Sequence, residues 1–172
     1  MQNIPVLSKK EKVELTFRPI EKKDNPQVAN IIRTVMTEFE CVGEGYSIND
    51  PEIDDMYAAY NNDRSAFYVI EEGAIILGCG GIAPLEGANG QICELRKMYF
   101  FPALRGKGWG RKMVERCLVV AKKLGYDRCY LETVERMEQA NFLYKKMGFE
   151  KSCEPLGNTG HSSCESYYIK EL

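Results

Sequence analysis

The stretch Ala103-Leu-Arg-Gly-Lys-Gly-Trp-Gly110 decides how the rest of this sequence is interpreted. It lies between an extended apolar run over 91–101, which Pro102 ends, and a helical pattern that begins near residue 110. Glycines let backbone N–H groups approach an anion closely, and the positive end of a helix dipole strengthens that attraction. The stretch therefore predicts a phosphate-binding turn, and a tight turn without a ligand stays the alternative.

Two familiar phosphate motifs do not match this stretch. A P-loop carries Ser or Thr directly after its Gly-Lys pair, whereas Gly106-Lys107 is followed by Gly108. A dinucleotide fingerprint would normally follow the first strand of a domain and precede an acidic residue that binds the ribose. The basic side chains of Arg105 and Arg111 still favour an anion nearby. The sequence thus disfavours a nucleotide-binding regulator.

Hydrophobic spacing predicts strands and helices on both sides of the turn. The predicted strands are 14–20, 66–71, 74–83, 91–101, 127–133, 149–153 and 164–170, and the predicted helices follow Asp24, Asp50, Gly110 and Met137. The helix after Gly110 is the clearest, because its apolar face repeats at helical spacing and Gly125 ends it. This order of elements predicts one α/β structure around one sheet.

The composition is that of one ordinary globular domain. The 172 residues are 44% hydrophobic and 28% charged with a formal net charge of −2, so we expect one domain over 1–172, with 1–12 as an N-terminal extension. The nearly balanced charge predicts no binding to nucleic acid or to an anionic membrane. No apolar segment is long enough for a signal peptide or a membrane span, so we expect a cytoplasmic protein.

Seven cysteines without a CxxC pair and a single histidine disfavour a metal site or a cysteine-histidine nucleophile. Cys93, Cys117 and Cys129 fall on predicted core elements, where packing is the expected role. His161 lies in a loop rich in Gly, Asn and Ser. There a solvated side chain is favoured over a place beside a substrate.

Two motifs resemble those of a known family. Arg105-x-x-Gly108-x-Gly110 resembles the pattern [RQ]-x-x-G-x-[GA] of the GNAT superfamily of acyl-CoA N-acyltransferases, and Leu143-Tyr144-Lys-Lys-Met-Gly148-Phe149 resembles its second signature, L-Y-x-x-x-G-F. The resemblance covers roughly 67–153 and implies a single-domain α/β (α+β) fold. In that fold a mixed, mainly antiparallel sheet of six to seven strands is flanked by about four helices. It also implies acetyl-CoA as the acyl-donor cosubstrate, with no metal.

The same resemblance implies where acetyl-CoA binds. Two parallel strands, 91–101 and 127–133, would splay apart, and the pantetheine arm would lie between them against the backbone near Met98, Tyr99 and Phe100. The pyrophosphate would bind the backbone amides of the glycine-rich turn, with two side chains at its margin. These positions are Arg105, Gly106, Lys107, Gly108, Trp109 and Gly110 for the amides, and Trp109 and Arg111 for the margin.

Transfer of an acetyl group to an amine needs a base, because a free alkylamine is almost wholly protonated at neutral pH. Several members of the family carry a glutamate base on the strand that Glu94 occupies. Strand alternation places Glu94, Arg96, Met98 and Phe100 on one face and Cys93, Leu95, Lys97 and Tyr99 on the other. Arg96 would orient Glu94 or receive a carboxylate of the substrate. The alternative is an exposed ion pair between Glu94 and Arg96.

Departure of CoA leaves a thiolate, for which Tyr144 is the candidate acid. The family often has a tyrosine at this point of its second signature, although Tyr144 also has the helical spacing of a packed side chain. Many relatives carry an asparagine at the head of this helix, where this chain has Met137. Asn141 lies within the helix instead, so the resemblance does not carry an asparagine contact to the cofactor.

The resemblance predicts an acetyl-CoA-dependent N-acetyltransferase that acts on a primary amine of a small molecule or a protein, by direct attack in a ternary complex. A non-catalytic acyl-CoA-binding or sensory module is the alternative. Expected partners are CoA and the amine acceptor, with neither nucleic acid nor membrane, and a homodimer is left open.

Overall fold

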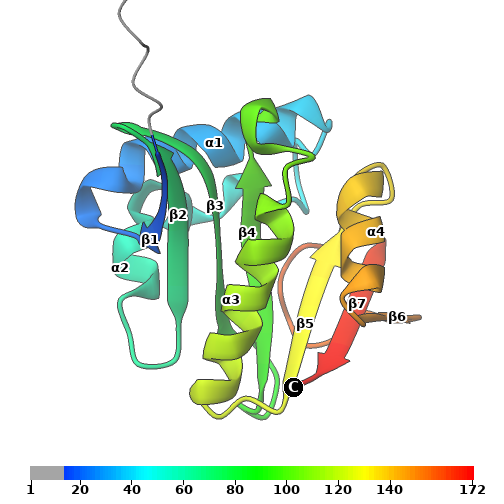
Figure 1. Cartoon of the computed structure of the whole chain (residues 1–172). Coiled ribbons are helices and arrows are strands. Elements are labelled where there is room, and N and C mark those ends of the chain that lie inside the picture. The colour runs from blue at the N-terminus through cyan, green and yellow to red at the C-terminus, as the bar shows by residue number, and fades with distance from the viewer. Residues whose placement is uncertain (1–13) are drawn as a thin grey trace, which may run out of the picture.

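The computed structural model describes residues 14–172, so the predicted extension over 1–12 lies outside the described residues. The strands are β1 (Leu15–Pro19), β2 (Ala66–Glu72), β3 (Ile75–Pro84), β4 (Ile92–Phe100), β5 (Arg128–Thr133), β6 (Glu150–Ser152) and β7 (Ser166–Glu171) (Figure 1). The α-helices are α1 (Asn25–Glu38), α2 (Met56–Tyr60), α3 (Trp109–Lys123) and α4 (Glu138–Lys146). Short 3₁₀ turns cover Lys22–Asp24, Ser47–Asn49, Pro51–Asp55 and Pro102–Leu104.

All seven described strands form one sheet in the order β1-β2-β3-β4-β5-β7-β6. The pairing of β4 with β5 is parallel, and the other neighbours pair antiparallel. The β2–β3 hairpin turns at Gly73, whose φ of 63° is a conformation that glycine adopts without strain. The predicted mixed, mainly antiparallel sheet flanked by helices is confirmed.

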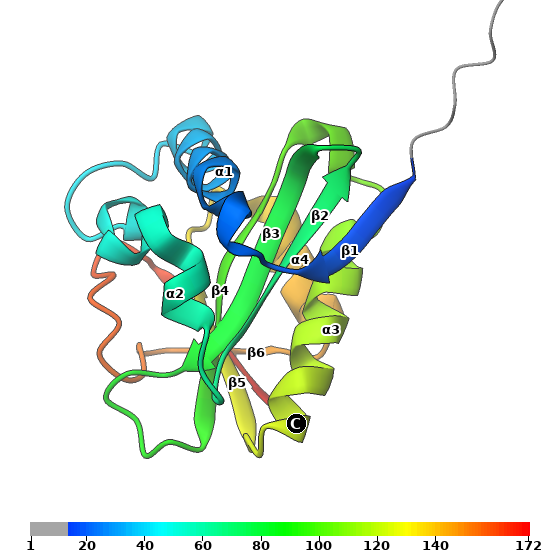
Figure 2. The ribbon, with the colours of Figure 1, turned by 90° about the vertical axis from the view of Figure 1, so that its left-hand side faces the viewer.

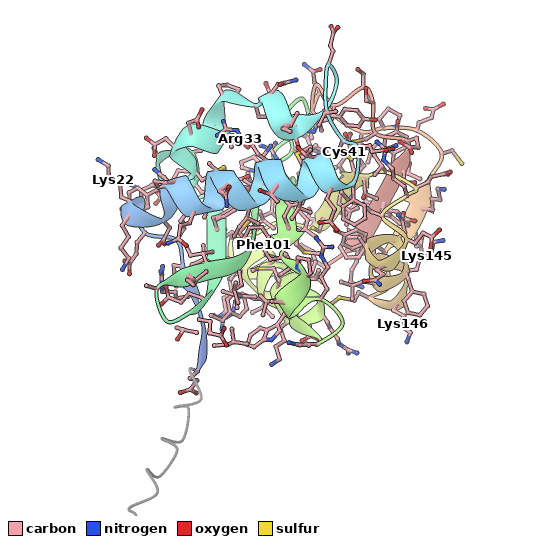
Figure 3. All side chains as sticks on the ribbon, turned by 90° about the horizontal axis from the view of Figure 1, so that it is seen from above. Lys22, Arg33, Cys41, Phe101, Lys145 and Lys146 are labelled. Carbon is pink, nitrogen blue, oxygen red and sulfur yellow. The ribbon has the colours of Figure 1, made fainter. Side chains whose placement is uncertain are left out.

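Helices cover both faces of the sheet. Figure 2 shows α1 and α2 on one side and α3 on the other, and the view from above in Figure 3 shows α1 lying across the sheet near Phe101. The inner face of α1 buries Val28, Ile31 and Ile32 almost completely, and Phe101 packs against the same cluster. On the opposite face, α3 and α4 share a second hydrophobic cluster with the sheet. The apolar spacing of each helix therefore decides which side it buries.

The strand β4 contains a β-bulge that reverses the predicted side-chain alternation. Between the pairs Gly81↔Arg96 and Cys79↔Tyr99, two residues of β4 oppose only Gly80 of β3, and Lys97 has a φ of 53°. Before the bulge, even-numbered side chains face α1 and α2, and after it the odd-numbered ones do. The predicted grouping of Glu94 with Met98 and Phe100 on one face is therefore wrong. Met98 and Phe100 pack on the α3 side, opposite to Glu94.

The two parallel strands separate after three paired positions. Ile92, Cys93 and Glu94 of β4 pair with Arg128, Cys129 and Tyr130 of β5, while β4 continues to Phe100 and β5 to Thr133. Figure 1 shows the two strands diverging toward the carboxyl end of β4. Within the described chain, the facing edges of the two strand ends have no strand partner, which leaves backbone groups for an extended ligand.

The described residues bear on disulfides, metal sites and membrane-spanning helices. The seven cysteines form no disulfide there, and five of them, including Cys93, Cys117 and Cys129, are buried. Among residues 14–172 no cluster of three or more His, Cys, Asp or Glu side chains has the arrangement of a metal site. No helix in that part of the chain is both long and apolar enough to cross a bilayer.

Candidate active site

The glycine-rich turn leads from the end of β4 into the N-terminus of α3. Gly106 and Gly108 have φ angles of 70° and 81°, and a Cβ atom at either position would meet no protein atom within 4 Å. These glycines are therefore required by backbone conformation, and their open side is free for a ligand. Gly110 differs, because a Cβ there would lie 3.3 Å from Leu143 Cδ2 of α4. It permits the close approach of α3 and α4.

The Arg105 side chain is engaged in holding the turn in place. Its two terminal nitrogens lie 2.5 and 2.7 Å from the carboxylate oxygens of Glu38 at the end of α1, and its Nε donates to the Phe100 carbonyl at 2.8 Å. Such a bidentate pair anchors the turn to a helix 67 residues earlier in the chain. The Arg105 backbone amide is also engaged, because it donates to the Pro102 carbonyl at 3.1 Å, so neither the side chain nor the amide of Arg105 is free for an anion, and the predicted amide contact at this position is corrected.

The other basic side chains of the turn lie at its exposed margin. Arg111 pairs with Glu115 one helical turn further on, at 2.7 Å, and both side chains are largely exposed. The Lys112 ammonium lies 4.1 Å from the centroid of the Trp109 ring. An exposed ion pair of this kind exchanges partners at little cost, so Arg111 is available to a bound anion.

Glu94 lies buried on the face of β4 that α2 covers. Glu94 is only 3% exposed, and its Oε2 accepts a hydrogen bond from Arg96 Nε at 2.5 Å. Arg96 is held in turn by the Pro84 carbonyl at 3.2 Å. Burial raises the pKa of Glu94 above its ordinary value, and the attraction of Arg96 opposes that rise. The Glu94–Arg96 contact exists, but the predicted alternative of an exposed ion pair is wrong because Glu94 is buried.

Four polar residues beside Glu94 were not recognised from the sequence. Lys97, which the bulge turns toward α2, contacts Asp50 directly and lies 3.5 Å from Glu52. The Glu132 side chain of β5 is 3% exposed and accepts hydrogen bonds from Tyr130 at 2.8 Å and Thr159 at 2.9 Å. These four residues come from three separate parts of the chain, and no local motif marks them.

His161 belongs to the same group and is not the solvated side chain that the sequence favoured. Its Nε2 lies 3.0 Å from Asp50 Oδ2, and its Nδ1 lies 3.9 Å from Glu132 Oε2. The side chain is 14% exposed. Sequence composition predicted a flexible polar loop there, but the contact with Asp50 spans 111 residues and depends on the tertiary fold.

The Tyr60 hydroxyl is buried beside this group without a hydrogen-bond partner among the described residues. The charges of Glu52, Arg96 and Glu94 all act on it, and burial raises its pKa well above the ordinary value. A buried hydroxyl without a partner is costly, so it is a candidate contact for a polar ligand. Together, Asp50, Glu52, Tyr60, Glu94, Arg96, Lys97, Glu132 and His161 form what we call the polar cluster.

Tyr144 lies on the opposite face of the sheet. It is 6% exposed, and its ring packs against Phe149 and Tyr168 at centroid distances of 5.9 and 6.1 Å. Burial raises its pKa, so the phenol stays protonated at neutral pH. The structure therefore does not bring Tyr144 and Glu94 into contact, because they lie on opposite faces of the sheet.

Asn141 has a structural role on the same helix. Its amide donates to the carbonyls of Val134 and Met137, both at 2.9 Å, and its carbonyl oxygen accepts from the Tyr168 hydroxyl at 2.8 Å. These bonds close the turn before α4 and connect it to β7. Asn141 is thus occupied by the protein itself.

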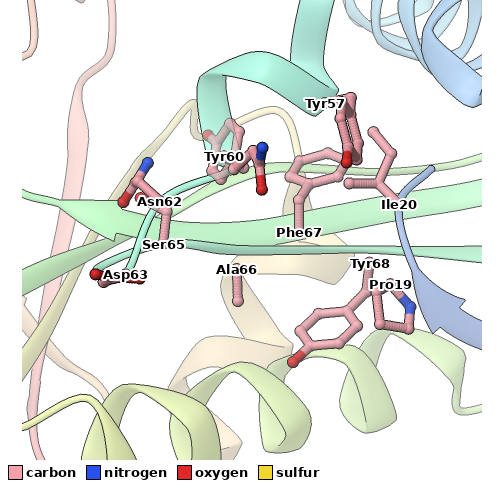
Figure 4. A pocket seen from close by; sticks show the side chains of 11 residues that line it. Pro19, Ile20, Tyr57, Tyr60, Asn62, Asp63, Ser65, Ala66, Phe67 and Tyr68 are labelled. Atoms are coloured by element: carbon pink, nitrogen blue, oxygen red, sulfur yellow. The ribbon is translucent and has the colours of Figure 1, made fainter. Parts of the chain in front are cut away.

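A separate hollow of about 390 Å³ lies beside α2 and the start of β2. Figure 4 shows Tyr57, Tyr60 and Phe67 around it, with Ile20 at its edge. None of the residues of the glycine-rich turn lines it, and Tyr60 is the one residue it shares with the polar cluster in the described part of the chain. This hollow is therefore not the site that the sequence motifs define.

Comparison with known proteins agrees with the fold and the motifs. The model of the acetyltransferase (GNAT) family matches residues 29–149. The uncharacterized N-acetyltransferase YjgM of Escherichia coli K12 is 42% identical over 157 residues, which are 91% of this chain and 94% of that protein. An acetyltransferase of the GNAT family from Staphylococcus aureus Mu50 superposes with a TM-score of 0.80 at 18% identity, over 92% of this chain and 99% of that one. The YncA protein of Salmonella typhimurium, solved with acetyl-CoA, superposes with a TM-score of 0.74 at 18% identity, over 92% and 94%. With its family model, its relative and its fold in agreement, this chain belongs to the acetyltransferase (GNAT) family.

Proposed function

We propose that this acetyltransferase transfers the acetyl group of acetyl-CoA to a primary amine, with Glu94 as the base and Tyr144 as the acid. The observation that carries the proposal is the hydrogen bonding of the buried Glu94 carboxylate. One of its oxygens is held by Arg96 at 2.5 Å, and nothing in the described chain hydrogen-bonds to the other. A buried, oriented carboxylate with one free oxygen is suited to accept a proton from an ammonium group.

The residues around the gap between β4 and β5 fit acetyl-CoA. The amides from Gly106 to Gly110 and the α3 N-terminus suit a pyrophosphate, because the backbone of Gly106 and Gly108 is open on one side. The unpaired edge of β4 near Met98, Tyr99 and Phe100 suits the amide groups of a pantetheine arm. Acetyl-CoA supplies the activated thioester, and the protein supplies the orientation.

The acid and base act on opposite sides of the same gap. Glu94 accepts a proton from the acceptor ammonium, directly or through water, so that the neutral nitrogen can form its bond to the acetyl carbon. The carbon–sulfur bond then breaks, and Tyr144 donates a proton to the leaving thiolate. The second proton of the attacking nitrogen leaves to water as the amide forms, and water returns a proton to Tyr144 and takes up the one that Glu94 holds. The raised pKa of Glu94 brings its basicity closer to that needed at neutral pH. Arg96 keeps Glu94 oriented.

The test is the Glu94→Gln variant, which is nearly isosteric and retains hydrogen bonding. We expect kcat/KM at neutral pH to fall by roughly 10²–10⁴, the usual contribution of a positioned base. The deficit should shrink as pH rises toward the pKa of the amine, because more acceptor then arrives neutral. A screen of primary amines that measures CoA thiol release supplies the acceptor.

Calorimetry of CoA binding is the control, since the glycine-rich turn is unchanged in this variant. Near-full activity of Glu94→Gln between pH 6 and 9, with CoA bound normally, would place the base elsewhere. If no amine releases CoA thiol from acetyl-CoA with the unmodified protein, the proposed reaction itself fails.

A further inference from the structure

Glu132 on β5 faces the same side of the sheet as Glu94 on β4. Tyr130, which pairs with Glu94, packs in one cluster with Ile92 of β4. Alternate residues of a strand share a face, so Glu94 projects to the same side as Ile92, and Glu132 to the same side as Tyr130. The negative charge of Glu132 also acts on Glu94. Glu132 therefore lies on the face that holds Glu94, just beyond the last paired position, where β5 diverges from β4 (Figure 1).

The Glu132 carboxylate is buried and has no cationic partner within hydrogen-bond distance among the described residues. Its side chain is 3% exposed, and it accepts hydrogen bonds from the hydroxyls of Tyr130 at 2.8 Å and Thr159 at 2.9 Å. His161 Nδ1 lies 3.9 Å away, which is too far for a hydrogen bond. A buried carboxylate is costly unless a positive charge offsets it. A cationic group of a ligand would therefore stabilise Glu132.

The two cationic side chains of the polar cluster, Arg96 and Lys97, are already engaged. Arg96 is paired with Glu94 at 2.5 Å, and Lys97 contacts Asp50 directly and lies 3.5 Å from Glu52. Their side chains are 18% and 2% exposed, so neither pair exchanges freely with solvent. Removing one partner of such a buried pair is costly. This arrangement disfavours an acceptor that brings a carboxylate of its own.

The charges of the polar cluster sum to a negative value. Four carboxylates and two cations leave a formal charge of −2, and the groups are Asp50, Glu52, Glu94, Glu132, Arg96 and Lys97. A protonated His161 would leave −1, so the sign is the same in either state of the imidazole. An acceptor with one ammonium group offsets part of this charge, whereas an acceptor with two ammonium groups offsets all of it.

The Tyr60 hydroxyl is a second, independent sign of a ligand at this place. Tyr60 is 5% exposed, and its hydroxyl has no hydrogen-bond partner in the described part of the chain. The charges of Glu52, Arg96 and Glu94 act on it, so it faces the polar cluster. A phenol oxygen accepts a hydrogen bond from an ammonium group. A polar ligand would supply the contact that this buried hydroxyl lacks.

We infer that the acceptor is a small molecule with two cationic groups, a diamine or a polyamine, with one ammonium beside Glu94 and Tyr60 and the second held by Glu132. The inference rests on the proposed function, because it names the class of amine that the same site takes. A small, linear acceptor fits better than a protein, since Glu132 and Tyr60 are both buried. Acetylation turns one ammonium into a neutral amide, so the product should bind more weakly than the acceptor.

The experiment compares three amines that share one aminobutyl chain and differ only at its far end. They are 1,4-diaminobutane, n-pentylamine and 5-aminopentanoate, which end in an ammonium, a methyl and a carboxylate group. Calorimetry measures their binding to the protein saturated with CoA, so no turnover is needed. We expect the diamine to bind about 10- to 100-fold more tightly than n-pentylamine, the contribution of one buried charge-assisted hydrogen bond. The amino acid should bind most weakly. Diamines from 1,3-diaminopropane to 1,6-diaminohexane, each with its matched alkylamine, cover the chain length.

Glu132→Gln assigns the preference to this carboxylate, because the amide still exchanges hydrogen bonds with Tyr130 and Thr159. It should remove the advantage of the diamine and leave n-pentylamine binding unchanged. In turnover, it should raise the KM for the diamine and not lower kcat. Glu135→Gln is the matched control, since Glu135 is 70% exposed and pairs with Lys151 at 3.6 Å. It should retain the full preference, and both variants should bind CoA normally.

The series on the unmodified protein tests the inference even if Glu132→Gln does not fold. The inference is overturned if no diamine binds more tightly than its matched alkylamine, or if 5-aminopentanoate binds most tightly. A preference that survives in folded Glu132→Gln overturns the role of Glu132. Thiol release from n-pentylamine as efficient as from the diamine would overturn the inference and leave the proposed reaction standing. A diamine preference in binding without any thiol release would do the reverse.

Discussion

Tyr144 combines the features of a packed residue and of an acid. Its ring packs between Phe149 and Tyr168, and its phenol stays protonated at neutral pH because burial raises its pKa. Tyr144→Phe keeps the ring and deletes only the hydroxyl, so stability should change little. Turnover should fall about 10- to 100-fold, at the weak end of general-acid contributions because water can substitute. Steady-state kinetics under conditions where chemistry limits the rate measure the effect.

The control for this variant is affinity for acetyl-CoA, which should be nearly unchanged. Equal kcat values for the two proteins would assign Tyr144 to packing alone.

The Arg105 side chain has two possible roles, anchoring the glycine-rich turn and contacting CoA directly, and its contacts allow a test that separates them. If its side chain acts by anchoring the turn, its partner Glu38 must matter as much as Arg105 itself, because the two form a bidentate pair. We therefore expect Glu38→Gln to weaken CoA binding several-fold. The double variant Glu38→Gln/Arg105→Gln should bind CoA no more weakly than Glu38→Gln alone. Calorimetry on the four proteins of this cycle gives the coupling.

If Glu38→Gln leaves CoA binding unchanged while Arg105→Gln reduces it, the anchoring role is contradicted and the Arg105 side chain acts on CoA directly.

At the level of elements, the turn into α3 depends on backbone conformation. Gly108 has a φ of 81° with open space around the position of a Cβ atom, so Gly108→Val strains the left-handed backbone by roughly 1–2 kcal/mol and places a branched side chain over the amides. Loss of two or three charge-assisted hydrogen bonds should then lower CoA affinity at least about a hundredfold. Calorimetry measures the affinity.

Gly125 offers a matched control at the other end of α3. It has the same φ of 81° and equally open surroundings, so Gly125→Val should cost similar stability in a denaturant titration. It lies away from the turn, and CoA affinity should be retained. Unchanged CoA binding in folded Gly108→Val would remove the turn from the cofactor site.

At the level of the whole molecule, a buried ion pair connects β1 to the start of α1. Asp24 is 2% exposed and accepts hydrogen bonds from Arg18 at 2.7 and 3.0 Å and from the Glu21 amide at 2.7 Å. Burial alone would raise the pKa of Asp24, but these hydrogen bonds outweigh it and the pKa is lowered. The stabilisation is therefore present above the unfolded value of about 3.9 and is lost as pH falls through the folded pKa.

Asp24→Asn should consequently reduce the free energy of unfolding at pH 7 by roughly 1.5–3 kcal/mol, and the difference from the unmodified protein should shrink below about pH 4. Urea titrations at several pH values measure it. Glu71→Gln is the control, because Glu71 is the second, more exposed partner of Arg18 and its loss should cost less. A difference for Asp24→Asn that persists at low pH would contradict the assignment.

The sequence by itself determined the elements and the place of the glycine-rich turn. Those features depend on local rules: apolar spacing selects the buried faces of α1 and α3, and glycines at 106 and 108 meet a backbone requirement. The two family motifs also identified the family, because their residues lie close together in the chain. The prediction of one domain over 1–172 stays a prediction.

Only the tertiary structure decided which side chains share a site. The bulge at Lys97 depends on Gly80 of the neighbouring strand, where a Cβ atom would lie 3.1 Å from Met98 Cγ, so strand alternation within β4 could not reveal it. His161 meets Asp50 across 111 residues, and Arg105 meets Glu38 across 67. Such contacts depend on how helices and loops pack on the sheet, and local periodicity carries no information about that packing.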